Sequence, residues 1–317
     1  MIEAKGLSKH YGATAAVDDL SFVVRSGVVT GFLGPNGAGK STTMRLLLGL
    51  DRPSAGGALI SGKRYVDFPA PLREVGALLE ARAVHTGRSA RAHLLAMAAT
   101  NRIPRARVDE VLGLVGLDAV AGKRAGGFSL GMGQRLGIAS ALLGDPGVLL
   151  LDEPVNGLDP EGIVWIRNLL KALAAEGRTV LVSSHLMSEM AVTASELIVV
   201  GRGRLIASGS VQDLILRAST GAVTVRTSEA DRLATLLAAA DRHIERVAPD
   251  TLQVSGMDSE TIGQVAAREA IALIALVPHQ ATLEEAFMEI TRDAVEFHGD
   301  TGTPGQPAPA AIAAGLR

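Results

Sequence analysis

Cysteine is absent from this chain of 317 residues, which excludes disulfide bonds and thiolate metal ligands. Aromatic residues make up 3% of the sequence, so the core has to be built mainly from Leu, Val, Ile and Ala. The sequence also lacks any run of the about 18 to 20 apolar residues that cross a bilayer, and its N-terminus lacks the layout of a signal peptide. We therefore expect a soluble chain, whose role at any membrane would depend on a partner.

Neither sign of charge dominates the sequence. The formal net charge is −2 and charged residues make up 20%, so composition gives no general reason to attract nucleic acid or an anionic membrane. We expect no nucleic-acid partner. The apolar fraction of 47% supports a sizeable core, and the length suits one large domain with a smaller second unit.

The first two thirds of the chain, about residues 1–215, have the pattern of an α/β domain. Short, almost continuous apolar runs bounded by Gly are typical of strands buried on both faces of a sheet. The predicted strands are 28–33, 147–151, 178–183 and 196–200. A helical insertion over about 86–143 interrupts this alternation, with helices expected at 89–101, 105–115 and 130–143.

A second, small α+β unit is predicted at about 220–298. Its expected strands are 222–227, 251–254 and 272–276, and its expected helices are 229–240, 259–270 and 283–297. Residues 299–317 are rich in Gly, Pro and Ala and hold few groups that could fix a core. We expect that tail to be disordered.

A glycine-rich phosphate loop follows the strand predicted at 28–33 and opens a helix predicted at 42–50. Its residues are Gly34, Pro35, Asn36, Gly37, Ala38, Gly39, Lys40 and Ser41, followed by Thr42. The glycines let backbone N–H groups turn inward as an anion nest, and the helix N-terminus adds its positive dipole end. Lys40 would reach the β- and γ-phosphates of ATP, and Ser41 would offer its hydroxyl to Mg²⁺. An accidental lysine in a glycine-rich turn is the disfavoured alternative.

Two carboxylates end the strand predicted at 147–151. Asp152 is placed to hold Mg²⁺, and Glu153 to polarise the attacking water as general base, a role worth about 10² to 10⁴ in rate. Without other motifs, carboxylates at a strand end are about as often simply exposed to solvent as catalytic. The presence of the phosphate loop favours the catalytic interpretation. His185 follows the strand at 178–183, whose carboxyl end would point toward the same crevice, and would sense the γ-phosphate and hold the water. A lone His after a strand is otherwise more often structural.

Three further segments complete a pattern. They are Phe128-Ser129-Leu130-Gly131-Met132-Gly133-Gln134-Arg135, then Asn156-Gly157-Leu158-Asp159, and Tyr11 in Lys9-His10-Tyr11-Gly12. Together with the phosphate loop, Asp152, Glu153 and His185, they resemble, in their order, the nucleotide-binding domain of ATP-binding cassette (ABC) transporters over about residues 2–210. Taken alone, Tyr11 is more often an ordinary surface aromatic.

The resemblance implies a P-loop NTPase cassette with a mainly parallel core sheet, an N-terminal antiparallel β region and a helical insertion. Tyr11 would stack on the adenine of ATP, and Asp159 would belong to the D-loop at the nucleotide site. Ser129 and Gly131 begin a helix with free N–H groups and would face the γ-phosphate bound by a second copy. Two chains would thus close head-to-tail around two ATP molecules.

Two positions depart from the family pattern. Leu130-Gly131-Met132 replaces the usual Gly-Gly-Gln of the signature, a variant similar to that of exporters of the bacitracin- and daunorubicin-resistance type. Glu80 stands where the family has Gln, so a carboxylate would ligate Mg²⁺ or its water and add negative charge near the γ-phosphate. The loop at 81–91 carries Arg82, His85, Arg88 and Arg91. We interpret them in the first place as charges exposed to solvent, and in the second place as contacts to a membrane partner.

The segment Thr282-Leu283-Glu284-Glu285-Ala286-Phe287 resembles the terminal helix of exporter ATPases whose membrane partner is a separate ABC-2-type permease. An amphipathic helix that packs on its own domain is the alternative. The resemblance implies a peripheral ATPase at the cytoplasmic face of the plasma membrane. Export of a drug, an antibiotic or another hydrophobic compound rests on the subfamily resemblance alone.

Other functions remain open at this point. A soluble ABC ATPase of the ribosome would carry two cassettes in one chain, and one for DNA repair would carry long coiled coils between its halves; neither pattern is present. A P-loop kinase or GTPase outside the family would not need the signature at 128–135. An importer is disfavoured by the signature variant and the separate C-terminal unit.

Overall fold

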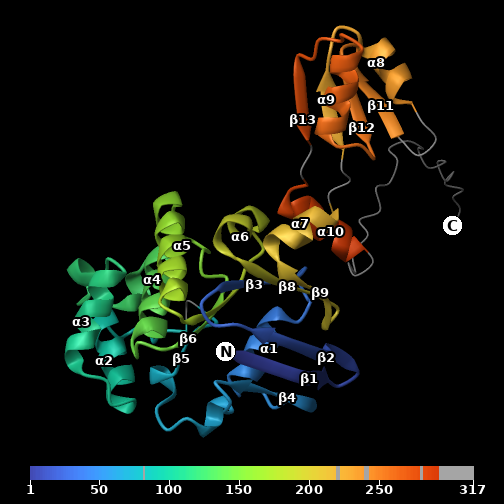
Figure 1. Ribbon diagram of the computed structural model, residues 1–317. Helices are drawn as coiled ribbons and strands as arrows, with labels where there is room; N and C mark the ends of the chain where they lie inside the picture. Colours follow the sequence, from blue (N-terminus) through green and yellow to red (C-terminus); the bar gives the residue numbers. More distant parts are fainter. Residues whose placement is uncertain (81–82, 219–221, 239–242, 279–280, 293–317) are drawn as a thin grey trace, which may run out of the picture.

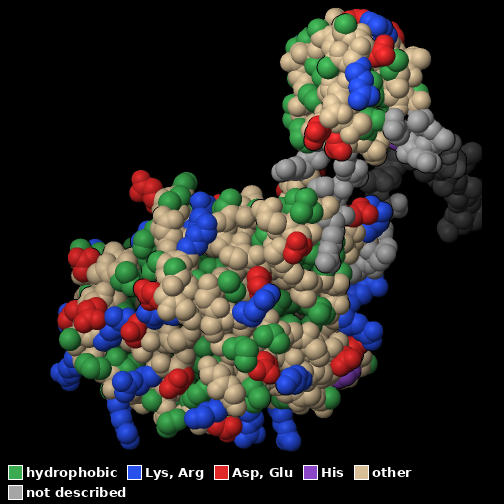
Figure 2. Space-filling view, viewed as in Figure 1, with side chains coloured by type: hydrophobic (Ala, Val, Ile, Leu, Met, Phe, Trp, Pro, Cys, Tyr) green, Lys and Arg blue, Asp and Glu red, His purple; other side chains and the backbone are tan. Residues whose placement is uncertain are grey.

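The computed structural model describes residues 1–80, 83–218, 222–238, 243–278 and 281–292. Two antiparallel sheets and one mixed sheet with helices make up these residues (Figure 1). The predicted disordered tail at 299–317 lies outside the described residues, as does Arg82. Lys, Arg, Asp and Glu side chains are mixed over the face that Figure 2 presents. Within the described ranges, no helix is both long enough and apolar enough to cross a bilayer.

A six-stranded sheet forms the centre, and its first five strands are parallel. In sheet order its strands are β5 (Val75–Leu78), β6 (Val148–Asp152), β7 (Thr179–Ser183), β3 (Val29–Leu33), β8 (Glu196–Gly201) and the antiparallel edge β9 (Arg204–Ser210). The predicted parallel core is confirmed, because runs such as β3 and β7 are buried at every position and so need cover on both faces.

A three-stranded antiparallel sheet packs against one face of the central sheet. Its strands, in the order β2-β1-β4, are β1 (Ile2–Tyr11), β2 (Thr14–Val24) and β4 (Ala55–Ile60). One apolar cluster joins them to the central strands and to helix α1 (Lys40–Leu47), and it includes a contact between the Phe22 and Phe32 rings, whose centroids lie 5.6 Å apart. The expected N-terminal antiparallel β region is therefore present.

The other face of the central sheet is covered by helices. They are α2 (Ala90–Thr100), α3 (Arg105–Leu114), α4 (Leu130–Leu142), α5 (Pro160–Ala175) and α6 (Met187–Thr193). Short 3-10 turns occur at Tyr65–Asp67, Pro71–Arg73, Asp118–Val120 and Ala125–Gly127. Helices α2, α4 and α5 begin at side-chain caps, where Ser89, Ser129 and Asp159 each accept a hydrogen bond from the backbone N–H of the third residue of the helix. The predicted helical insertion corresponds to α2, α3 and α4.

The C-terminal sheet has its own apolar core. Its strand order is β11-β12-β10-β13, all antiparallel, with α8 (Ala230–Leu237) and α9 (Ser259–Arg268) as its helices. The strands are β10 (Val223–Arg226), β11 (His243–Ala248), β12 (Thr251–Ser255) and β13 (Ala275–Pro278). Strand β11 was not predicted, because its largely exposed residues give no apolar signal. The strand predicted at 272–276 begins three residues later.

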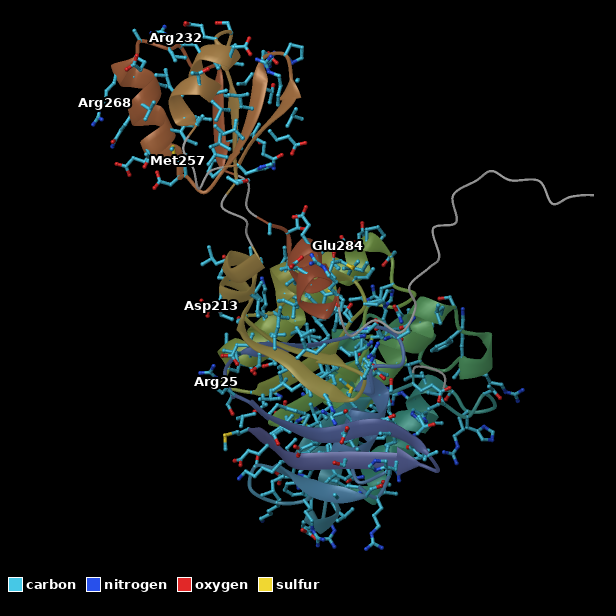
Figure 3. All side chains as sticks on the ribbon, turned by 90° about the vertical axis from the view of Figure 1, so that its right-hand side faces the viewer. Arg25, Asp213, Arg232, Met257, Arg268 and Glu284 are labelled. Carbon is cyan, nitrogen blue, oxygen red and sulfur yellow. The ribbon has the colours of Figure 1, made fainter. Side chains whose placement is uncertain are left out.

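The last described helix, α10 (Leu283–Thr291), does not join this C-terminal sheet as predicted. It packs against α7 (Val211–Ala218), α6 and β9, and Leu283 and Phe287 are buried in the core of the central sheet. Figure 3 shows Glu284 beside the central sheet, whereas Met257 and Arg268 lie on the C-terminal unit. An apolar stripe shows that a helix is covered, but not by which surface, and this ambiguity explains the error.

We expect Phe287→Ala to reduce the free energy of unfolding by about 3 to 5 kcal/mol, because it leaves a cavity among α6, α7 and α10. Denaturant unfolding followed by circular dichroism measures this loss. Met288→Ala is the matched control, since Met288 on the same helix is 62% exposed. Equal losses for the two variants would show that α10 contributes little to the core.

Candidate nucleotide site

The phosphate loop crosses from the carboxyl end of β3 into α1. Gly39 caps this helix with φ of 95°, a left-handed conformation that glycine adopts without strain. A Cβ atom at Gly39 would lie 2.3 Å from the carbonyl oxygen of Ala16, so no larger residue fits there. The loop encloses a cavity of about 320 Å³. Its lining residues are Ala16, Asn36, Gly37, Ala38, Gly39, Lys40, Ser41, Thr42, Asp152 and Glu153.

The Lys40 ammonium lies within this loop. Its Nζ donates to the carbonyl oxygen of Gly34 at 2.6 Å and to that of Pro35 at 3.2 Å. Burial lowers the pKa of Lys40, while the negative charges of Glu153 and Asp152 act in the opposite direction. A cation that is partly desolvated and held by neutral carbonyls suits an anionic ligand such as a phosphate.

Asp152 ends β6 and is held by two hydroxyl groups. Ser41 Oγ donates to its Oδ2 at 2.7 Å, and Ser183 Oγ donates to its Oδ1. The hydroxyl of Ser41 and the carboxylate of Asp152 are hard oxygen donors beside a phosphate cradle, and this donor set suits Mg²⁺.

Ser183 is a site residue that the sequence analysis missed. It ends β7 opposite Asp152 in the parallel register and is completely buried. Its Oγ also accepts from the backbone N–H of Glu153 at 3.0 Å. The signal that points to it is a hydroxyl at the carboxyl end of an otherwise apolar strand that lies between β6 and β3.

Glu153 and His185 meet at the same edge of the sheet, as their positions after β6 and β7 predicted. His185 Nδ1 lies 2.7 Å from Glu153 Oε2, and the His185 backbone N–H donates to the same oxygen at 3.3 Å. The Glu153 side chain is 22% exposed and that of His185 is 54% exposed. Both groups remain within reach of solvent; Glu153 lines the phosphate cavity, whereas His185 does not.

Tyr11 and Glu80 do not line this cavity. The Tyr11 hydroxyl donates to Asp51 Oδ2 at 2.9 Å, which raises the pKa of Tyr11. Glu80 is exposed and lines a different cavity, of about 400 Å³, between α1, α2 and α4. Glu80 follows the edge strand β5, whereas the phosphate loop follows β3, which lies three strands away in the sheet. The end of β5 therefore does not meet the phosphate loop.

The expected contacts to a second chain lie elsewhere on the surface. Ser129 caps α4, accepting from the Met132 N–H at 3.2 Å, and lines a separate cavity of about 300 Å³. Gly131 packs closely on the D-loop, because a Cβ there would lie 2.7 Å from the Gly157 carbonyl oxygen. Asp159 caps α5, accepting from the Gly162 N–H at 2.9 Å. Ser129, Gly131 and Asp159 do not line the cavity of the phosphate loop.

Comparison with known families gives matches in both parts of the chain. Residues 17–156 match the model described as ABC transporter, residues 123–191 match an AAA domain described as a putative AbiEii toxin of a type IV system, and residues 221–284 match a domain of unknown function. The matched ABC transporter region contains the phosphate loop, Asp152 and Glu153.

Individual relatives extend this match. The bacitracin transport ATP-binding protein of Bacillus licheniformis is 43% identical over 209 residues, covering 65% of this chain and 68% of that protein. The Nod factor export ATP-binding protein I of Ralstonia nicotianae is 33% identical over 303 residues, covering 92% of this chain and 94% of that protein. A solved structure of an ABC transporter ATP-binding subunit is 29% identical with a TM-score of 0.64, covering 68% of this chain and 92% of that one. This chain is an ATPase and belongs to the ATP-binding proteins of ABC transporters.

Proposed function

We propose that this chain is the ATPase subunit of an exporter whose membrane pathway is a separate ABC-2-type permease. The supporting observation is the similarity to a Nod factor export ATP-binding protein, which extends over 92% of this chain and therefore includes the C-terminal unit. The bacitracin transport relative supports a cargo among antibiotics or other hydrophobic compounds. Such a subunit works at the cytoplasmic face of the plasma membrane, held there by the permease.

In this proposal the phosphate loop binds ATP, and Lys40 exchanges its loop carbonyls for the β- and γ-phosphate oxygens. Mg²⁺, held by Ser41 and Asp152, neutralises charge on the phosphates when bound. Glu153 accepts a proton from the water that attacks the γ-phosphate. His185 Nδ1 lies 2.7 Å from Glu153 Oε2 and thereby orients the carboxylate; its role of sensing the γ-phosphate is part of this proposal.

A second copy completes each site. Ser129 and Gly131 lie outside the chain's own phosphate cavity, at the N-terminus of the 13-residue helix α4, where N–H groups and the helix dipole favour an anion. A head-to-tail dimer brings this end to the γ-phosphate held by the other chain. Asp159 lies in the D-loop between the two sites, and Tyr11 stacks on adenine once its ring is free of Lys9, whose Nζ lies 4.9 Å from the ring centroid.

Purification with a candidate permease tests the proposed function. We expect the chain to co-purify with a membrane protein of about six helices in the length range that spans a bilayer, and cargo to stimulate ATP hydrolysis in the reconstituted complex. Strict co-migration with ribosomes or DNA, and no association with membranes, would contradict the exporter assignment.

We expect Glu80→Gln to raise the Mg²⁺ concentration needed for half-maximal ATPase activity by up to about thirtyfold. This upper bound follows from the about 2 kcal/mol with which a unit charge attracts a divalent cation at 4 Å in water, and it applies when Glu80 moves toward the metal as the dimer closes. Mg²⁺ titrations of phosphate release measure it. Glu74→Gln, at the exposed opposite end of β5, is the control; superimposable curves for all three proteins would remove Glu80 from the metal site.

A further inference from the structure

Gln134 is a buried polar residue in the second turn of α4. Its side chain is 3% exposed, and its Nε2 donates to the backbone carbonyl oxygen of Glu153 at 3.1 Å. A buried amide without a partner carries a substantial free-energy cost, so this hydrogen bond fixes where the Gln134 side chain lies. It also joins a helix of the insertion to the residue that follows β6.

The backbone of Glu153 needs support. Its φ is 49°, in the left-handed region that a residue with a Cβ adopts at a cost of about 1 to 3 kcal/mol. Ser183 holds the N–H side of the residue through its carbonyl oxygen at 3.2 Å and its Oγ at 3.0 Å. Gln134 holds the carbonyl side. The two contacts fix the peptide groups on either side of the Glu153 Cα, and with them the direction of its side chain.

The first turn of α4 also packs on the loop after Glu153. A Cβ at Gly157 would lie 2.3 Å from Leu130 Cγ, so the Leu130 side chain covers this glycine of the D-loop. Gly157 has φ of 75°, which makes it doubly difficult to replace. Helix α4 is therefore joined to the segment from Glu153 to Gly157 at two points, one at each end of that segment.

We propose that Gln134 is a positioning residue for Glu153, and that it links the helix end facing the second chain's nucleotide to the base of its own chain. This inference rests on the proposed role of Glu153 as base. When Ser129 and Gly131 engage the γ-phosphate of the opposite site, α4 moves as a unit, and Gln134 transfers that movement to the Glu153 carbonyl. The binding of ATP at the other chain's phosphate loop thereby changes the position of the catalytic carboxylate in each chain.

Gln134→Met tests this link, because Met preserves the length and volume of the side chain but cannot donate a hydrogen bond. We expect kcat for ATP hydrolysis to fall by about ten- to a hundredfold, as displaced catalytic groups typically cause, with KM for ATP within about twofold of the original value. The control is Ser140→Ala on the same helix, which removes the buried hydroxyl that donates to Leu136 O at 2.9 Å and leaves Glu153 untouched. Its kcat should be unchanged.

Two outcomes would overturn the inference. One is an unchanged kcat for Gln134→Met; the other is a fall in kcat that Ser140→Ala reproduces, which would show a general effect of loosening α4. In a Glu153→Gln background, Gln134→Met should leave ATP-dependent dimer formation intact, and loss of the dimer would place Gln134 in nucleotide binding instead. A wild-type rate of hydrolysis by the single variant Glu153→Gln would contradict the assignment of Glu153 as the base. That result is separate from an unchanged kcat for Gln134→Met, which would contradict only the positioning role of Gln134.

Discussion

Glu153→Gln is expected to reduce ATP hydrolysis by about 10² to 10⁴-fold while ATP binding is retained. The amide matches the carboxylate in size and still accepts from the His185 backbone N–H, but it cannot take a proton from the attacking water. Because the γ-phosphate then persists, ATP should also trap the closed dimer. Single-turnover phosphate release measures the first effect, and light scattering after gel filtration with ATP measures the second.

The matched control for this variant is Glu176→Gln. Glu176 caps the C-terminal end of α5, and its exposed carboxylate accepts hydrogen bonds from Arg178 Nε and Nη2. Glu176 lies between the C-terminal end of α5 and the start of β7, at the end of each element that is remote from the nucleotide site. The Glu176→Gln variant should therefore hydrolyse ATP at the unaltered rate. A wild-type rate for Glu153→Gln would show that another group accepts the proton.

Lys40→Ala is expected to weaken ATP binding itself, by roughly ten- to a hundredfold. A hydrogen bond from a charged donor contributes about 1.5 to 3 kcal/mol, and about 1.4 kcal/mol corresponds to tenfold in affinity. Burial lowers the pKa of Lys40 although Glu153 and Asp152 act in the opposite direction, so a phosphate oxygen that contacts the ammonium directly adds to the stabilisation of its charge. Titration with a fluorescent ATP analogue or calorimetry measures the affinity.

Lys171→Ala separates this effect from a general loss of positive charge, because Lys171 lies exposed on α5. That control should bind ATP as the unaltered protein does. An ATP affinity that Lys40→Ala leaves unchanged would contradict the role assigned to the lysine, although the loop backbone would still account for the anion nest.

The central sheet and the meeting of Asp152, Glu153 and His185 were predictable from the sequence. Buried parallel strands are continuous apolar runs, and the rule that ligands bind beyond their carboxyl ends placed these three side chains together. Which polar groups hold them was not predictable. Ser183 contacts Asp152 because β6 and β7 are neighbours. Gln134 reaches Glu153 because α4 packs on the central sheet beside β5. Both contacts exist only in the folded chain.

Helix ends and covered faces show the same limit. The helix predicted at 283–297 is present from Leu283 to Thr291, because the Thr282–Glu285 capping box and the apolar stripe are local signals. Residues 293–297 of that prediction lie outside the described residues. Its partner surface is not a local property, and the prediction that it belongs with the C-terminal sheet was wrong. Glu80 was assigned to the metal because it stands where the resembled family has Gln; in the structure it follows the edge strand β5 and lines a different cavity from the phosphate loop.

The contact between α7 and α10 gives the chain an unusual modularity. The segment carrying the C-terminal sheet leaves the cassette after α7 and returns at α10, so both of its attachments are anchored on one small area of the same core. Joining two points that are already neighbours has a small entropic cost. The segment can therefore be exchanged for a short connector while the ATPase keeps the helix that completes its core.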